Sequence, residues 1–247
     1  MNRIDNYQEL SANIIKWLSD YAINNGGVKA FVVGVSGGID SAVVSTLAAS
    51  TGLPTYALGM PIHQNPEQES LSDDHLEWLQ TNFSNVAVQK FDLTRLFETF
   101  RFSLREFGAD THALANTRSR LRMVTLYQVA TTVGGIVVGT GNKIEDYGVG
   151  FYTKYGDGGV DIAPIADLYK TEVWELGKFF GISQKIIDAK PTDGLWDDGR
   201  TDEDQLGASY SELEEAMETG SGPGLEALLK FGALNQHKMN PIPTFKL

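Results

Sequence analysis

Short apolar runs alternate with longer amphipathic stretches along most of this chain. The runs are rich in β-branched residues, which predicts buried strands at residues 30–35, 55–60, 86–91, 136–140 and 162–165. Apolar positions at helical spacing predict helices at residues 5–25, 70–83, 94–107, 111–133, 167–180, 210–219 and 225–233, with another after residue 41. The alternation predicts an α/β fold, with a doubly wound parallel sheet of about five strands flanked by helices.

The domain organisation follows from length and continuity. The chain has 247 residues, of which 42% are hydrophobic, and this is enough to bury one large core. No internal repeat, interdomain linker or low-complexity run interrupts the sequence. We therefore expect a single Rossmann-like domain over residues 1–247 that ends in C-terminal helices.

Composition narrows the chemistry. The chain has no cysteine, which excludes disulfides, thiolate metal sites and cysteine nucleophiles, and its four histidines form no ligand-like pair for zinc. The net charge of −12 favours a small-molecule substrate over a nucleic acid. Neither a secretory signal nor an apolar stretch of membrane-spanning length is recognisable, so we expect a cytoplasmic protein without a membrane partner.

The strand at residues 30–35 runs into a helix through Ser-Gly-Gly-Ile-Asp-Ser at residues 36–41. Gly37 and Gly38 lack a Cβ, so their backbone can approach a bulky anion, and the helix N-terminus offers unpaired N–H groups. Ser36 and Ser41 add hydroxyl donors, whereas the Asp40 carboxylate would repel a phosphate unless a cation lay between them. The stretch therefore predicts a magnesium–nucleotide site, with an ordinary glycine-rich turn as the alternative.

The kind of nucleotide chemistry follows from comparing this loop with known ones. It has no Gly-x-x-x-x-Gly-Lys-Ser/Thr pattern, so it is not a Walker loop, and the dinucleotide fingerprint Gly-x-Gly-x-x-Gly is also missing. Ser-Gly-Gly-x-Asp-Ser resembles the pyrophosphate-binding loop of ATP pyrophosphatases. That resemblance implies that the β,γ-pyrophosphate of ATP leaves while an oxygen nucleophile attacks the α-phosphorus.

Further polar residues lie where ligands bind in open α/β sheets, beyond the carboxyl ends of strands. The strand at residues 136–140 ends at Thr140, which can contact a nucleotide, and Glu145 is a second oxygen ligand candidate for magnesium. Residues 150–161 combine four glycines with aromatics, a lysine and two aspartates, which is typical of a binding loop. Lys170 falls in the first turn of a predicted helix, where a cation is unfavourable unless an anion is bound nearby.

Three features leave two interpretations open. Arg118 and Arg122 share a helix face while Arg120 points elsewhere, and they predict either a solvated face or a fork for phosphate or carboxylate. Residues 190–207 read as a mobile loop that is either an active-site lid or a connector. His75 is expected to be a packed or surface histidine rather than a catalytic one.

Several of these stretches together resemble NAD synthetase in order and spacing over essentially the whole chain. The most specific is Phe-Tyr-Thr-Lys-Tyr-Gly-Asp-Gly-Gly-Val-Asp at residues 151–161, supported by Pro-Thr at 191–192 and His-Lys at 237–238. The resemblance implies ATP-dependent amidation of deamido-NAD by ammonia, through an adenylated intermediate, with release of AMP and pyrophosphate. It also implies a homodimer with the deamido-NAD site at the interface. Without a cysteine nucleophile we expect no glutaminase domain in this chain.

The same resemblance assigns residues to roles. It implies ATP contacts from Gly34, Val35, Ser36, Gly37, Gly38, Ile39, Asp40, Ser41, Thr140, Lys170 and Thr192. It implies a magnesium ion held by Asp40 and Glu145. It implies deamido-NAD contacts from Arg120, Phe151, Lys154, Asp161, His237 and Lys238. Asp157 would receive ammonium and take its proton, and Lys170 would stabilise charge on the departing pyrophosphate.

Two departures from the family pattern affect these assignments. The segment between Glu145 and Lys154 carries one residue more than the simplest pattern, so residues 146–149 have no clear match. Gly-Met-Pro at residues 59–61 stands where many ammonia-dependent members have an arginine near the nucleotide. The alternatives are another ATP pyrophosphatase, such as a tRNA-modifying lysidine synthetase-like enzyme, and a non-catalytic ATP-sensing module.

Overall fold

The computed structural model describes residues 4–108, 110–192, 194–195 and 200–246. Within these residues a four-stranded parallel sheet has the order β3-β2-β1-β4. Its strands are β1 (Phe31–Gly34), β2 (Thr55–Gly59), β3 (Val86–Lys90) and β4 (Ile136–Val137). Phe31 pairs with Thr55 on one side and with Ile136 on the other. The order reverses beside β1, so the loops after β1 and β4 meet at a topological switch point.

The predicted fold class is confirmed, but the sheet has four strands in the described residues rather than about five. Residues 162–165 contribute only an isolated parallel bridge between Val138 and Ile162. The Asp161 carboxylate accepts a hydrogen bond from the backbone N–H of Val137 at 2.8 Å. A side chain therefore takes a backbone donor that a fifth strand would need, and β4 ends at Val137 instead of Thr140.

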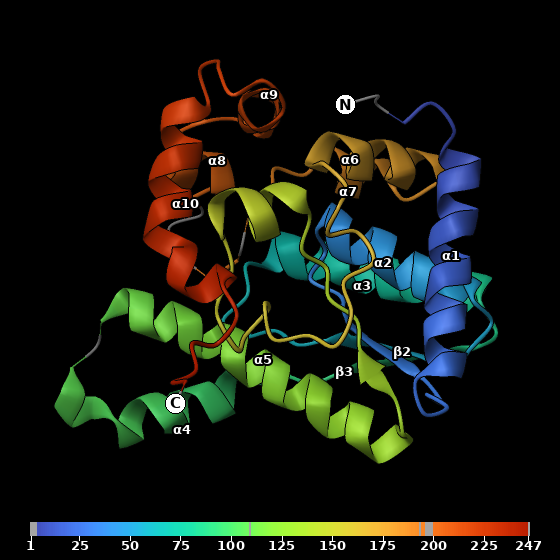
Figure 1. Ribbon diagram of the computed structural model, residues 1–247. Helices are drawn as coiled ribbons and strands as arrows, with labels where there is room; N and C mark the ends of the chain where they lie inside the picture. Colours follow the sequence, from blue (N-terminus) through green and yellow to red (C-terminus); the bar gives the residue numbers. More distant parts are fainter. Residues whose placement is uncertain (1–3, 109, 193, 196–199, 247) are drawn as a thin grey trace.

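Helices cover both faces of the sheet (Figure 1). One face carries α1 (Tyr7–Asn24), α2 (Ile39–Ser50), α3 (Pro66–Asn82), α6 (Lys170–Phe179) and α7 (Gln184–Ile187). The opposite face carries α4 (Thr94–Ser103) and α5 (Thr111–Val133), and the short 3₁₀ turn η1 (Arg105–Phe107) lies between them in the chain. Side chains of β1 alternate between the two faces, since Phe31 and Val33 pack with α1 and α2 whereas Val32 packs with α5. Strands buried on both faces explain the continuous apolar runs of the sequence.

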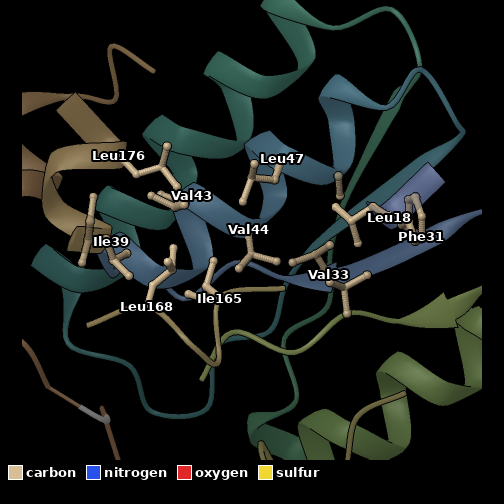
Figure 2. Packing of buried hydrophobic residues seen from close by; sticks show 14 of the residues in the cluster. Leu18, Phe31, Val33, Ile39, Val43, Val44, Leu47, Ile165, Leu168 and Leu176 are labelled. Atoms are coloured by element: carbon tan, nitrogen blue, oxygen red, sulfur yellow. The ribbon is translucent and has the colours of Figure 1, made fainter. Parts of the chain in front are cut away.

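The largest core cluster fixes the helix that follows the nucleotide loop. Ile39, Val43 and Leu47 of α2 pack against Val33 of β1 and against Leu176 of α6 (Figure 2). His75 is buried nearby, within 3.0 Å of the Ser45 hydroxyl, and its ring stacks on Trp78. The prediction of a packed histidine is confirmed.

The C-terminal helices form a separate group beside the sheet (Figure 1). It comprises α8 (Asp202–Leu206), α9 (Tyr210–Thr219) and α10 (Leu225–Met239), which pack around a π-helix, η2 (Ile144–Val149). The prediction of a loop over residues 190–207 is wrong for its second half, because Asp202–Leu206 form α8, which Thr201 caps. Positions 193 and 196–199 of that segment lie outside the described residues. The lid function stays a prediction.

Several element boundaries differ from the sequence expectations. α3 begins at Pro66 rather than residue 70, because the Asn65 side chain caps it and proline suits a first helical position. α10 continues to Met239 instead of residue 233, so it carries the His-Lys pair of residues 237–238 in its last turn. Throughout the part of the chain that is described, each helix is too short or too polar to cross a membrane.

Candidate active site

The turn from β1 into α2 has the geometry expected of an anion-binding loop. Gly37 adopts a left-handed backbone with φ of 90°, and a Cβ there would lie 2.7 Å from the carbonyl oxygen of Gln68. Only glycine fits at position 37, because any side chain would be strained by this backbone conformation and would clash with Gln68. The Ser41 hydroxyl is buried in the turn, where it accepts from the backbone N–H of Ser36 and donates to the carbonyl of Gly38. No side chain of the described residues caps α2, so its first N–H groups can meet an anion.

Lys170 joins the two carboxylates that the sequence analysis assigned to a metal. Its ammonium lies 2.5 Å from Asp40 Oδ2 and 3.2 Å from Glu145 Oε1, and the lysine side chain is only 3% exposed. Burial alone would lower the pKa of Lys170, but the two carboxylates outweigh burial and raise it. Burial raises the pKa of Glu145, opposed by the lysine charge. The anions near Lys170 in this structure are thus residues of the chain itself.

The donor set of this cluster fits Mg²⁺. Asp40 and Glu145 both reach one ammonium position, so their oxygens converge on a single cation. Asn142 supports this arrangement, because its amide nitrogen lies 3.3 Å from Asp40 Oδ1 and its amide oxygen accepts from the backbone N–H of Glu145. Nowhere in the described chain do three His, Cys, Asp or Glu side chains gather as metal ligands. Mg²⁺ suits two carboxylates because it takes its remaining ligands from phosphates and water.

Asp157 occupies a second polar position and is held by α5. The Ser119 hydroxyl donates to Asp157 Oδ1 at 2.5 Å and accepts from the backbone N–H of Asp157 at 2.9 Å. The backbone N–H of Thr153 also donates to Oδ1. Burial raises the pKa of Asp157, and the Ser119 hydrogen bond opposes that rise. These contacts fall on Oδ1, which leaves Oδ2 as the oxygen available to a ligand.

One cavity of about 280 Å³ connects these groups. It is lined by every residue predicted to bind ATP: Gly34, Val35, Ser36, Gly37, Gly38, Ile39, Asp40, Ser41, Thr140, Lys170 and Thr192. Glu145, Phe151 and Asp157 also line it. The cavity therefore places the glycine turn after β1, the Asp40–Glu145 pair and the Asp157 carboxylate within reach of one ligand.

Comparison with known proteins decides the family. The NAD synthase family model matches residues 10–242. The chain belongs to the NAD synthase family. The NH(3)-dependent NAD(+) synthetase of Carboxydothermus hydrogenoformans is 37% identical, covering 94% of this chain and 95% of the relative. That of Methanococcoides burtonii is 40% identical over 83% of this chain and 78% of the relative. These relatives count against a tRNA-modifying enzyme.

Solved structures agree with this NAD synthase assignment. The NMN synthetase of Francisella tularensis superposes with a TM-score of 0.91 at 35% identity, covering 99% of this chain and 100% of that protein. The NH3-dependent NAD synthetase of Campylobacter jejuni superposes with a TM-score of 0.79 at 24% identity, which supports the fold alone.

The residues predicted for the second substrate of this NAD synthase lie mainly outside the cavity. Of that set only Phe151 lines it; Arg120, Lys154, Asp161, His237 and Lys238 do not. Arg120 donates to the backbone carbonyl of Lys154 at 3.2 Å, and Lys238 donates to the carbonyl of Tyr152 at 2.6 Å. Burial lowers the pKa of Lys238, opposed by the charge of Asp157. We refer to this set without Phe151 as the outer rim.

Arg118 and Arg122 of α5 face the interior while Arg120 is exposed, as their spacing predicts. The interpretation of a solvated face is therefore wrong for Arg118 and Arg122. Arg118 is buried and donates to the carbonyl of Leu195 at 2.8 Å. Arg122 lines the cavity and donates to the carbonyl of Met60 and to the side chain of Gln64, both at 3.0 Å. An arginine from α5 thus reaches residues 59–61, where the sequence lacks the arginine of many NAD synthases.

The segment between Glu145 and Lys154, predicted to carry one residue more than the family pattern, contains the π-helix η2. A π-turn contains one residue more than an α-turn, so an insertion can be absorbed without displacing its flanks. Glu145 and Phe151 accordingly both line the cavity, and the backbone N–H of Phe151 donates to the carbonyl of Glu145 at 2.9 Å. α10 supports η2, since the Asn235 side chain donates to the carbonyl of Val149.

Three residues of the site escaped the sequence analysis: Ser119, Asn142 and Tyr210. Asn142 follows the strand end directly and could have been inferred from its position beside Thr140 and Glu145. Ser119 and Tyr210 sit on amphipathic helices that looked like ordinary packing elements. Nothing in their spacing indicated proximity to Asp157 or Glu145.

Proposed function

We propose that this chain is a ligase that amidates deamido-NAD to NAD with ammonia, at the expense of ATP cleavage to AMP and pyrophosphate. The observation that carries the proposal is the single cavity shared by the nucleotide loop, the Asp40–Glu145 pair and Asp157. The relatives named NH(3)-dependent NAD(+) synthetase support it. Such chemistry, which consumes ATP and ammonia, fits a cytoplasmic location.

The first half-reaction would be adenylation. A carboxylate oxygen of the nicotinate attacks the α-phosphorus of ATP, and the bond to the bridging oxygen breaks as pyrophosphate leaves. The amides of residues 36–41 and the start of α2 bind the outer phosphates, with Thr140 and Thr192 as further contacts. Lys170 moves from the carboxylates toward the departing pyrophosphate and stabilises its charge.

Asp40 and Glu145 would hold Mg²⁺ in this reaction. The ion, when bound, neutralises phosphate charge and so removes the repulsion between Asp40 and the nucleotide. Because Lys170 occupies the position between the two carboxylates, its release from them accompanies nucleotide binding. With Mg²⁺ bound, the two carboxylates would keep a counter-ion after Lys170 leaves them.

The second half-reaction would be aminolysis at Asp157. Ammonium binds beside the carboxylate, Asp157 takes one proton, and the resulting ammonia attacks the activated carbonyl as AMP leaves. A raised pKa makes the Asp157 carboxylate a stronger base for this proton. No nucleophile from the protein is needed, in agreement with a chain that has no cysteine. The same lack of a thiol favours free ammonia over glutamine as the nitrogen source.

The dinucleotide would extend from Phe151 onto the outer rim, and we infer a homodimer that completes this part of the site. Beside the rim, α5 and the 151–161 loop carry a shallow groove lined by Met123, Val124, Tyr127 and Tyr155. Val124 and Tyr155 are 65% and 60% exposed, which favours coverage by a second copy. Sedimentation equilibrium would test this, with a concentration-independent monomer as the contradicting result.

A second candidate substrate is nicotinate mononucleotide. The TM-score of 0.91 to an NMN synthetase, with almost complete mutual coverage, favours it specifically. The chemistry at the cavity would be the same, because the shorter substrate has the same nicotinate carboxylate. Only contacts to the adenylate half at the outer rim would be lost.

One assay tests both substrates. The protein is incubated with ATP, magnesium and ammonium, and with either deamido-NAD or nicotinate mononucleotide, and the amidated product, AMP and pyrophosphate are measured. Equimolar NAD, AMP and pyrophosphate supports the main proposal, and a higher kcat/KM for the mononucleotide supports the second. Accumulation of ADP, or nucleotide binding without turnover, would contradict both.

A further inference from the structure

Tyr210 is a buried tyrosine whose hydroxyl reaches the cation-binding cluster. It is the first residue of α9 and is fully buried. Its hydroxyl lies 2.8 Å from Glu145 Oε1 and 3.1 Å from Asp202 Oδ2. The residues it joins lie 65 and 8 positions away in the sequence. Tyr210 therefore ties the C-terminal helices to Glu145.

The ring of Tyr210 contacts the third member of the cluster as well. The ammonium of Lys170 lies 4.7 Å from the ring centroid, within range of a cation–π interaction. Trp174, one turn further along α6, packs edge-on against the same ring. One side chain thus touches both the carboxylate and the lysine that share the cation position.

The backbone of Tyr210 is held firmly in place. Ser209 caps α9 in a reciprocal arrangement with Glu212, and the backbone N–H of Tyr210 donates to Glu203 of α8. Leu206 and Leu213 pack in the same cluster as the tyrosine. A hydroxyl supported in this way acts as a fixed donor, since neither the helix start nor the ring can shift independently.

Both side-chain partners of Glu145 contact the same carboxylate oxygen. Lys170 and the Tyr210 hydroxyl both bind Oε1. Once Lys170 moves to the phosphates, the hydrogen bond from Tyr210 would remain on Oε1 and would hold the carboxylate in the orientation that it has beside the cation position. A neutral hydroxyl that donates to a carboxylate orients it and leaves its negative charge available to a metal ion.

We propose that Tyr210 is a positioning residue that orients Glu145 for the metal–nucleotide complex and so couples α9 to the cavity. The inference rests on the proposed magnesium role of Glu145, but not on the identity of the substrate that is amidated. Tyr210 touches no reacting atom and acts through Glu145.

The test is metal binding by Tyr210→Phe, which removes the hydroxyl and keeps the ring. Mn²⁺ binding is measured by electron paramagnetic resonance in the presence of the α,β-methylene analogue of ATP, which cannot be cleaved at the α-phosphorus. Loss of one hydrogen bond to a charged metal ligand predicts binding weaker by about 10- to 100-fold. Tyr169→Phe is the matched control, because Tyr169 is a buried tyrosine of the same cluster whose ring contacts Lys143 rather than Lys170. It should bind Mn²⁺ within about twofold of the parent protein.

Two results would overturn the proposal. One is unchanged Mn²⁺ binding by Tyr210→Phe, and the other is equal weakening in both variants, which would indicate a general effect of cluster packing.

If Tyr210→Phe fails to fold by circular dichroism, 3-fluorotyrosine at position 210 keeps the ring and strengthens the donor. That protein should bind Mn²⁺ at least as tightly as the parent, and weaker binding would refute the assignment. Since no turnover is required, failure of the amidation assay with weakened Mn²⁺ binding would affect only the proposed function.

Discussion

The ammonium of Lys170 lies 2.5 Å from Asp40 Oδ2, although 130 residues separate the two in the sequence. Lys170 begins α6 and Asp40 lies in the first turn of α2, so the packing of these two helices creates the contact. The lysine is nearly inaccessible and serves as a counter-ion for two carboxylates before any nucleotide arrives. Lys170 therefore neutralises the two carboxylates in the free protein, as Mg²⁺ would do once it is bound.

Replacing Lys170 should destabilise the protein more in the absence of Mg²⁺ and ATP than in their presence. Lys170→Met leaves Asp40 and Glu145 without a counter-ion, and breaking such a buried pair costs about 3 kcal/mol. Thermal unfolding should show a lower Tm that Mg²⁺ and ATP partly restore, while pyrophosphate release falls by at least about 100-fold. Lys178→Met, which removes an exposed partner of Glu175 on the same helix, should leave Tm and activity nearly unchanged. Equal effects of both substitutions would contradict the role of Lys170.

Asp40 provides the direct test of the metal assignment. Asp40→Ala should abolish pyrophosphate release because it removes a cation ligand, while the fold stays intact because Glu145 remains as a counter-ion of Lys170. Activity is measured by pyrophosphate release and folding by circular dichroism. Asp20→Ala, on the surface of α1, is a suitable control. Near-normal turnover of Asp40→Ala would refute magnesium binding at this residue.

Ser119 should set the acid limit of the reaction. Burial raises the pKa of Asp157 and the Ser119 hydrogen bond lowers it, so Ser119→Ala raises the pKa further. Lys238 and Asp146 also face Asp157 electrostatically, and neither is altered by this change. The acid limb of kcat/KM for ammonia against pH should therefore move to higher pH in Ser119→Ala. Ser103→Ala, on exposed α4, should leave the profile in place, and an unmoved profile in Ser119→Ala would exclude the tuning role.

Arg120 should act on the nicotinate substrate rather than on ATP. It lies on the outer rim, away from the cavity that holds every predicted ATP contact. Arg120→Ala should raise the KM for deamido-NAD by about tenfold, as expected for a charged contact, and change the KM for ATP little. Arg101→Ala, which removes an exposed ion pair with Glu98, is the control. An equal rise for both substrates would show that Arg120 is structural.

His75 should make stability depend on pH. Burial, opposed by a hydrogen bond to Ala42, lowers its pKa from 6.5 to about 4. Between these values the unfolded chain binds a proton that the folded chain refuses, so stability falls as pH decreases below 6.5. From pH 7 to pH 5 the loss attributable to this group is about 2 kcal/mol. Urea unfolding of the parent and of His75→Gln at both pH values measures it, and an identical pH dependence in the two proteins would contradict it.

Local sequence determined much of this protein. The apolar runs identified the four strands to within a few residues, because strands that helices cover on both faces are mostly apolar; β3, at the edge of the sheet, still ends in the exposed residues Gln89 and Lys90. Ser-Gly-Gly-Ile-Asp-Ser predicted the tight turn after β1, since Gly37 has a backbone conformation and a clearance that only glycine satisfies. Every residue predicted to contact ATP lines one cavity, because the loops after parallel strands meet at one edge of the sheet.

Tertiary packing decided what these patterns could not. The count of strands depended on Asp161, whose carboxylate takes a backbone donor of β4. The partner of Lys170 depended on how α6 packs against α2, and the support of Glu145 and Asp157 came from Tyr210 on α9 and Ser119 on α5. Each of these contacts joins elements far apart in the chain. The spacing within an element records which face is buried, but it carries no information about which distant side chain that face will meet.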